Sequence, residues 1–182
     1  MKLKALAALC MRKGEFWLTD GASGQWLGTS EAQYLLPGLP YLHEENLAGL
    51  FDITGKQAEK IIFRHQPLLG KYNFGDADEG ETLLDRGHMT LGCDGGTFRP
   101  LITSTGLELI DERLFAPLAD AAYLELYERR DGDGDAYFAV KSGMLVAAVF
   151  LPVRRVAGKL TTENLEALAS AARMSLGRGR WE

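Results

Sequence analysis

The sequence lacks an apolar run long enough to cross a membrane as a helix, which takes roughly 20 residues. The longest apolar run, 144–153, has only the length of a strand. The apolar stretch 6–10 has the outline of a lipoprotein signal, but it is shorter than a signal core, and Leu9 is not the small residue expected before a lipidated cysteine. We therefore expect the N-terminus to belong to the folded domain, and the protein to be cytoplasmic with no membrane partner.

Cysteine and histidine are scarce as well. Cys10 and Cys93 lie far apart, and two cysteines do not make a disulfide framework, so we expect free thiols in a reducing compartment. The 3 histidines are His43, His65 and His88, and no two of them have the one-turn spacing of a zinc-hydrolase helix. We expect no metal site and no cofactor.

An excess of positive charge is also missing. The net charge of −5 opposes DNA binding by the surface as a whole. Acids gather in 73–94, where Arg86 is the single basic residue. The N-terminal segment has the opposite balance, with no acid before Glu15, and its basic residues are Lys2, Lys4, Arg12 and Lys13. If the protein binds DNA, we expect these four side chains to contact the phosphates, independently of base sequence.

The composition is that of an ordinary globular domain. The chain has 182 residues, of which 46% are hydrophobic and 25% charged, so one domain with its own core is expected. Apolar side chains recur with helical spacing over 3–11, which predicts an amphipathic helix. Shorter β-type runs separated by glycine-rich turns follow. The pattern predicts the α+β class.

The expected elements can be placed along the chain. In the first half, strands are expected at 15–19, 25–29 and 32–36, a helix at 44–51, a drift from helical to extended character over 56–63, and a loop over 64–81. Asp20-Gly21 predicts the first hairpin. In the second half, strands are expected at 88–93, 97–104, 107–110, 123–128, 136–141 and 144–151, and a helix at 162–176. Asp111 is expected to cap a short helix that reaches residue 119.

Catalytic and phosphate-binding motifs are missing. Asp131, Asp133 and Asp135 imitate the start of a calcium loop, but Ala136 and Ser142 stand where glycine and glutamate are needed. A polar hairpin turn is the simpler interpretation. No nucleophile elbow, triad or phosphate loop is present. The sequence therefore predicts a protein that is not an enzyme, because a small-molecule enzyme would need a constellation that is missing here.

Aromatic side chains cluster on the first expected strands. Trp17 and Trp26 flank the Asp20-Gly21 turn, and Tyr34 follows on the next strand. Packing in the core or across the hairpin is one interpretation. A surface that binds a protein partner or stacks on bases is the other, so we keep these three residues as candidate partner-binding residues.

Two segments resemble one domain of the bacterial DNA sliding clamp, the β subunit of the replicative polymerase. Phe16-Trp17-Leu18-Thr19-Asp20-Gly21, followed by Trp26-Leu27, is similar to the family's strand that ends in Thr-Asp-Gly. Phe150-Leu151-Pro152-Val153-Arg154 resembles the family's closing strand. The two segments also occur in the family's order. The resemblance implies one clamp-like domain with a strand–helix–three-strand unit used twice, over residues 1–158, with 37–106 as an insertion and 159–182 as an added helix and basic tail.

The resemblance also implies a function. It points to a non-catalytic accessory domain, of a phage or mobile element for example, that binds double-stranded DNA or a protein and forms a homo-oligomer. The alternative is a structural or regulatory protein-interaction domain with no DNA binding. Under that alternative, the face of Trp17 and Trp26 and the acidic stretch 73–94 would contact the partner.

Overall fold

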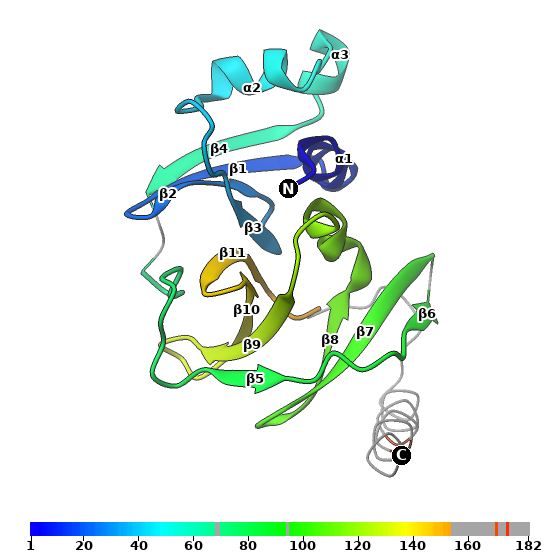
Figure 1. Cartoon of the computed structure of the whole chain (residues 1–182). Helices are drawn as coiled ribbons and strands as arrows, with labels where there is room; N and C mark the ends of the chain where they lie inside the picture. Colours follow the sequence, from blue (N-terminus) through cyan, green and yellow to red (C-terminus); the bar gives the residue numbers. More distant parts are fainter. Residues whose placement is uncertain (68–69, 94, 154–169, 171–173, 175–182) are drawn as a thin grey trace.

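The computed structural model describes residues 1–67, 70–93 and 95–153, with 170 and 174 besides. In this part the chain has the α+β fold that the sequence predicts, built around a mixed sheet (Figure 1). The expected helix at 162–176 falls almost wholly outside the described residues, and the basic tail falls outside them as well. Within the described part, no helix is long and apolar enough to span a membrane.

The first half follows the predicted order of a helix and three strands. Helix α1 (Leu3–Lys13) ends at Gly14, which takes the left-handed conformation with φ of 72° that favours glycine. An antiparallel meander follows, formed by β1 (Glu15–Gly21), β2 (Gly24–Gly28) and β3 (Ala32–Leu35). The buried side of α1 is formed by Leu6, Leu9 and Cys10. The sequence predicts the stripe Leu3, Leu6, Ala7 and Cys10, so it is right for Leu6 and Cys10, while Leu9 was not foreseen and Leu3 and Ala7 are only partly buried.

The second half repeats this order. Strand β8 (Gly106–Asp111) leads into the 3₁₀ helix η1 (Glu112–Leu118). A second antiparallel meander follows, formed by β9 (Leu124–Arg130), β10 (Ala136–Ser142) and β11 (Leu145–Phe150). The predicted strands are all present here.

The helix after Asp111 is capped as predicted but differs in type. The Asp111 carboxylate accepts a hydrogen bond from the Arg113 backbone N–H at 2.9 Å. Pro117 lies inside the helix and has no N–H to donate. The expected helix is of the 3₁₀ type and ends at Leu118.

The two halves meet symmetrically. Strands β3 and β11 pair antiparallel, so the central strand order β1-β2-β3-β11-β10-β9 places the two meanders end to end. Helices α1 and η1 lie against each other on one side of the sheet, and the Lys2 N–H donates to the Pro117 carbonyl at 2.7 Å (Figure 1). In the described part of the chain, β8 precedes η1, whereas α1 has no strand before it. Within these residues the strand–helix–three-strand unit is complete in the second half.

The region 37–106 extends the sheet at both edges. Strand β4 (Ile62–Pro67) pairs parallel with β1, and β5 (Thr82–Leu84) pairs antiparallel with β9. The expectation of a loop over 64–81 was therefore wrong for β4, and β5 was not foreseen. The sequence of β4 hides it, because an exposed edge strand that carries Arg64 and His65 shows little apolar alternation.

The rest of this region is peripheral. Helices α2 (Glu44–Leu50) and α3 (Gly55–Ala58) lie beyond β4 (Figure 1). Strands β6 (Leu91–Cys93) and β7 (Gly96–Thr103) form the predicted hairpin, and β7 pairs with β8 in a second sheet.

The large sheet has two different faces. The inner face lies under α1 and η1 and carries the main core, in which Phe150 packs on Tyr34 and Phe115. The outer face carries a smaller cluster around Trp26, Tyr137 and Val149. We call these the inner face and the outer face below.

Candidate functional site

A hollow on the outer face lies between β1 and β3. The register aligns Trp17 of β1 with Gly28 of β2, then with Gln33 of β3 and Val149 of β11. Gly28 has no side chain to fill the position between Trp17 and Gln33. It must be glycine, because a Cβ there would lie 1.9 Å from the Ala32 carbonyl oxygen. The tight turn after β2 therefore keeps this position free of a side chain.

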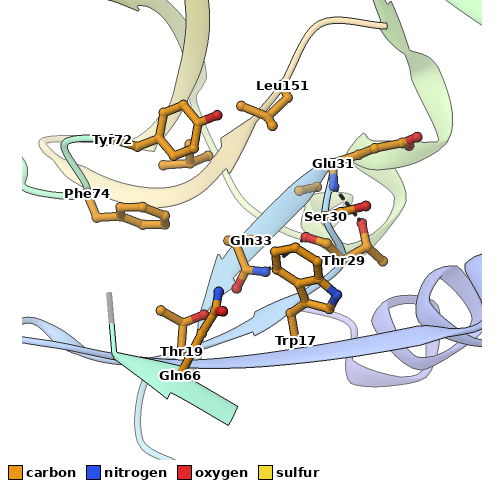
Figure 2. A pocket seen from close by; sticks show the side chains of 12 residues that line it. Trp17, Thr19, Thr29, Ser30, Glu31, Gln33, Gln66, Tyr72, Phe74 and Leu151 are labelled. Atoms are coloured by element: carbon orange, nitrogen blue, oxygen red, sulfur yellow. Dashed lines mark hydrogen bonds between the residues drawn. The ribbon is translucent and has the colours of Figure 1, made fainter. Parts of the chain in front are cut away.

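The segment that follows β4 covers one side of this hollow. The Tyr72 ring packs edge-on against Tyr137, with centroids 5.1 Å apart, and the Phe74 ring packs edge-on against Trp26 at 4.8 Å. Figure 2 shows Trp17 and Gln33 rising from the sheet while Tyr72 and Phe74 approach from another side. The result is a pocket of about 400 Å³ that is open to solvent.

The lining of this pocket is mainly apolar. Its apolar and aromatic residues are Trp17, Ala32, Tyr72, Phe74, Val149 and Leu151. Its polar residues include Thr19, Thr29, Gln33 and Gln66. An apolar hollow with a few convergent polar groups is the usual form of a binding site. We call it the Trp17 pocket.

The Trp17 ring is held in place before any ligand arrives. Its Nε1–H donates to the Glu15 carboxylate at 3.0 Å, and the Arg64 guanidinium lies 5.0 Å from the ring centroid. The other Glu15 oxygen accepts from the Ser30 N–H at 2.8 Å. The wall of the pocket is therefore tied to both the start of β1 and the turn before β3.

A buried ion network fixes the opposite wall. The fully buried Arg129 donates to the Glu81 carboxylate at 2.6 Å and to the carbonyls of Asn73 and Gly75. Lys141 donates to the other Glu81 oxygen. Burial alone would raise the pKa of Glu81, but the hydrogen bonds from Lys141 and Arg129 outweigh it and hold the pKa below its ordinary value. The network anchors the segment that carries Tyr72 and Phe74.

A second pocket of about 850 Å³ adjoins the first and shares four of its residues, Ser30, Glu31, Tyr72 and Leu151. Its far end is lined by Asp131, Asp135 and Pro152. The two pockets therefore form one groove that is mainly apolar at one end and carries carboxylates at the other.

The three aspartates after β9 form a hairpin turn, as the sequence predicts. Asp131 Oδ1 accepts from the backbone N–H groups of Asp133 and Asp135, both at 2.9 Å. Lys71 bridges to Asp131 at 3.2 Å and to Asp133 at 2.7 Å. Among the described residues, no group of His, Cys, Asp or Glu side chains could hold a metal ion.

The three predicted partner-binding residues differ in how exposed they are. Trp26 and Tyr34 are both 0% exposed, so both serve packing and neither can contact a partner. The Tyr34 hydroxyl donates to the Leu114 carbonyl at 2.7 Å on the inner face. Trp17 alone remains partly exposed and lines the pocket. It faces Gly28 across the hairpin, while Trp26 faces Thr19, so the expected pairing of the two tryptophans is absent.

The four predicted DNA-binding residues also differ, because two of them form ion pairs with acidic residues. Lys2 pairs with Asp120 at 2.9 Å, and Lys13 pairs with Glu31. Lys4 and Arg12 are exposed, and within the described part of the chain neither has an ion-pair partner. The two lie two helical turns apart, about 12 Å along α1. The basic patch is therefore half neutralised.

A polar cluster that the sequence did not suggest lies at the end of β1. His65 Nε2 lies 2.8 Å from Asp20 Oδ2, and the ring centroids of His65 and His43 are 6.1 Å apart, with Tyr41 beside both. Burial alone would raise the pKa of Asp20, but hydrogen bonds from Tyr41, Gln25 and His65 lower it. The cluster holds the segment before α2 against the sheet.

Most residues of the pocket were not foreseen from the sequence. Gln33 comes from β3, whereas Tyr72 and Phe74 come from the segment after β4, and only the register and the fold of the chain bring them to Trp17. The sequence did mark the acidic stretch 73–94, which begins inside the segment that covers the pocket. Comparisons of the chain with protein-family models, with curated proteins and with solved structures found no match.

Proposed function

We propose that this chain is a non-catalytic, clamp-like accessory domain that binds an extended segment of a protein partner. The segment inserts one apolar side chain into the Trp17 pocket and lies along the groove towards Asp131 and Asp135. One observation carries the proposal. The two segments that resemble the sliding clamp are far apart in the sequence, yet Trp17 from the first and Leu151 from the second line the same pocket.

The shape of the groove supports a peptide as its occupant. The Trp17 pocket offers aromatic and aliphatic walls to an anchoring side chain, which is where binding energy concentrates. The other end of the groove carries Glu31, Asp131 and Asp135. Lys13 pairs with Glu31 and Lys71 pairs with Asp131, so the apolar anchor rather than charge selects the partner. The walls are fixed in advance by Glu15 and by the Glu81 network, which reduces the entropy that binding costs.

A displayed library of random linear peptides tests the proposal. Peptides are selected on the parent protein and their affinities are measured by fluorescence anisotropy against the parent and two variants. Trp17→Ala removes a wall of the pocket. Tyr123→Ala is the matched control, because Tyr123 is 90% exposed and does not line the groove.

We expect the selected peptides to share an apolar anchor. Trp17→Ala should weaken them at least tenfold, while Tyr123→Ala leaves them unchanged. Circular dichroism of each variant confirms that the fold is retained. Peptides that bind the parent and Trp17→Ala equally well would sink the proposal.

DNA binding is the second candidate, favoured by the exposed Lys4 and Arg12 on α1. Two cations give a weak, salt-dependent contact with phosphates. Light scattering at low and physiological salt, with and without duplex DNA, tests this candidate together with homo-oligomer formation. An oligomer that binds duplex DNA would favour this candidate, whereas a monomer indifferent to DNA would remove it.

A further inference from the structure

The strands beneath the Trp17 pocket have no open edge that faces it. The pocket is lined by residues of β1, β3, β4 and β11. Strand β1 pairs with β2 and β4, β3 pairs with β2 and β11, and β11 pairs with β3 and β10. Strand β4 is the outermost strand, and its open edge points away from β1. A bound segment therefore cannot extend the sheet by adding a strand in this pocket.

The segment that covers the pocket also uses backbone groups within the protein. Asn73 lies between Tyr72 and Phe74 in the sequence, and its N–H donates to the Tyr137 hydroxyl at 2.9 Å. Its carbonyl accepts from Arg129, also at 2.9 Å. A bound segment thus gains no backbone ladder from Asn73 or from the sheet, and a backbone group buried without a partner is costly. Its own conformation must keep the backbone hydrogen-bonded to itself or to water.

Two conformations meet this requirement, the α-helix and the polyproline II helix. An α-helix binds a groove through an apolar stripe that repeats over successive turns. The apolar walls here are those of the Trp17 pocket, and the groove next to it carries the carboxylates of Asp131 and Asp135. Only one position of such a stripe would therefore be buried. A polyproline II helix has no internal hydrogen bonds and keeps its backbone in water, and it binds through single side chains that enter aromatic-lined grooves.

Proline suits the walls of this pocket. The rings of Trp17, Tyr72 and Phe74 line it (Figure 2), and proline has a compact apolar ring and no N–H to leave unpaired against them. The fixed φ of proline also lowers the entropy that is lost on binding. We infer that the partner segment is a polyproline II helix whose proline ring is the anchor in the Trp17 pocket. This inference rests on the proposed function, because it names the anchor and the conformation of the same partner segment.

Two probes with the same atoms and opposite hands test the inference on the full chain. Fluorescein-labelled L-decaproline forms the left-handed polyproline II helix, and D-decaproline forms its mirror image. Their affinities are measured by fluorescence anisotropy against the parent, Trp17→Ala and the control Tyr123→Ala. Unlabelled peptides selected from the random library then compete with L-decaproline, which shows whether both occupy the same site.

We expect L-decaproline to bind the parent about tenfold more tightly than D-decaproline, and the selected peptides to displace it. Trp17→Ala should remove the difference between the two hands, and Tyr123→Ala should keep it. The comparison on the parent stands even if a variant fails to fold.

Equal binding of both hands would overturn the polyproline inference and leave the pocket standing. Selected peptides that bind the Trp17 pocket while L-decaproline does not bind, or is not displaced by them, would have the same meaning. If neither the library nor L-decaproline yields a peptide that binds, the inference and the proposed function both fail.

Discussion

The two faces of the large sheet are covered and stabilised in different ways. The inner face is closed by α1 and η1 over a continuous apolar core, in which aromatic rings such as Phe150 and Tyr34 pack on each other. The outer face is covered by an irregular segment that a buried ion network holds in place, with Arg129 at its centre. Close packing leaves little free space on the inner face, whereas the outer face keeps a hollow.

This difference separates the residues that specify the fold from those available for binding. On the inner face, the Tyr34 hydroxyl donates to the Leu114 carbonyl and the Tyr34 ring packs on Phe150 in the core. On the outer face, Trp17 is fixed by Glu15 yet stays partly exposed and lines the pocket. The comparison predicts that substitutions on the inner face act on stability and that substitutions around the hollow act on binding.

The largest effect is expected from Phe150→Ala on the inner face. Phe150 is 0% exposed and packs against Tyr34 and Phe115, so its truncation should lower the free energy of unfolding by about 3–5 kcal/mol. Urea denaturation followed by circular dichroism measures the loss. Phe74→Ala is the matched change on the outer face and should cost less, because the hollow beside Phe74 already limits its packing. An equal loss in both variants would contradict the proposed difference between the faces.

Glu81→Gln should come next. The change leaves Arg129 buried without its carboxylate, so at pH 7 the free energy of unfolding should fall by about 3 kcal/mol. Because the pKa of Glu81 is lower in the folded protein than its ordinary value of 4.5, its contribution is present above that value and is lost as the pH falls through the folded pKa.

The pH dependence provides the internal control for this variant. The gap in unfolding free energy between the parent and Glu81→Gln should be largest at neutral pH and should shrink as the pH is lowered below 4.5. Urea denaturation at several pH values measures it. A gap that is independent of pH would mean that the carboxylate charge of Glu81 does not hold the outer segment in place.

The inner face was readable from the sequence and the outer face was not. The apolar stripe of α1 and the turn signals at Asp20-Gly21 and Asp131 act locally, so the strands of both meanders could be placed. The hollow depends on pairings between distant segments. Trp17, Trp26 and Tyr34 are all aromatic residues of predicted strands, and the sequence does not distinguish their exposure. Strand register and the covering segment decide which of them stays exposed. Strand β4 was missed because it is an exposed edge strand with little apolar alternation.

Tyr34→Phe should have a smaller effect and sharpen the comparison. It removes the hydroxyl that donates to the Leu114 carbonyl at 2.7 Å, which should lower the free energy of unfolding by about 1 kcal/mol. Binding of the selected peptides to the Trp17 pocket should not change, because Tyr34 points to the other face. Thermal unfolding and fluorescence anisotropy of the labelled peptides measure the two quantities. A loss of peptide binding in this variant would show that the two faces are coupled.

The smallest effect on stability is expected for the double change of Lys4 and Arg12 to glutamine. Both side chains are exposed on α1, and exposed sites without a specific contact usually change stability by less than about 0.5 kcal/mol. If α1 contacts duplex DNA, each cation should contribute about 0.9 to the slope of log affinity against log salt concentration. The double change should then reduce that slope by about 1.8.

The double change of Lys2 and Lys13 to glutamine is the control for this experiment, because Asp120 and Glu31 already neutralise these two lysines. It should reduce the slope less than the change of Lys4 and Arg12 does. Fluorescence anisotropy of a labelled duplex between low and physiological salt measures both slopes. Equal slopes for the parent and both variants would remove α1 from any DNA contact and leave the outer face as the binding surface of the molecule.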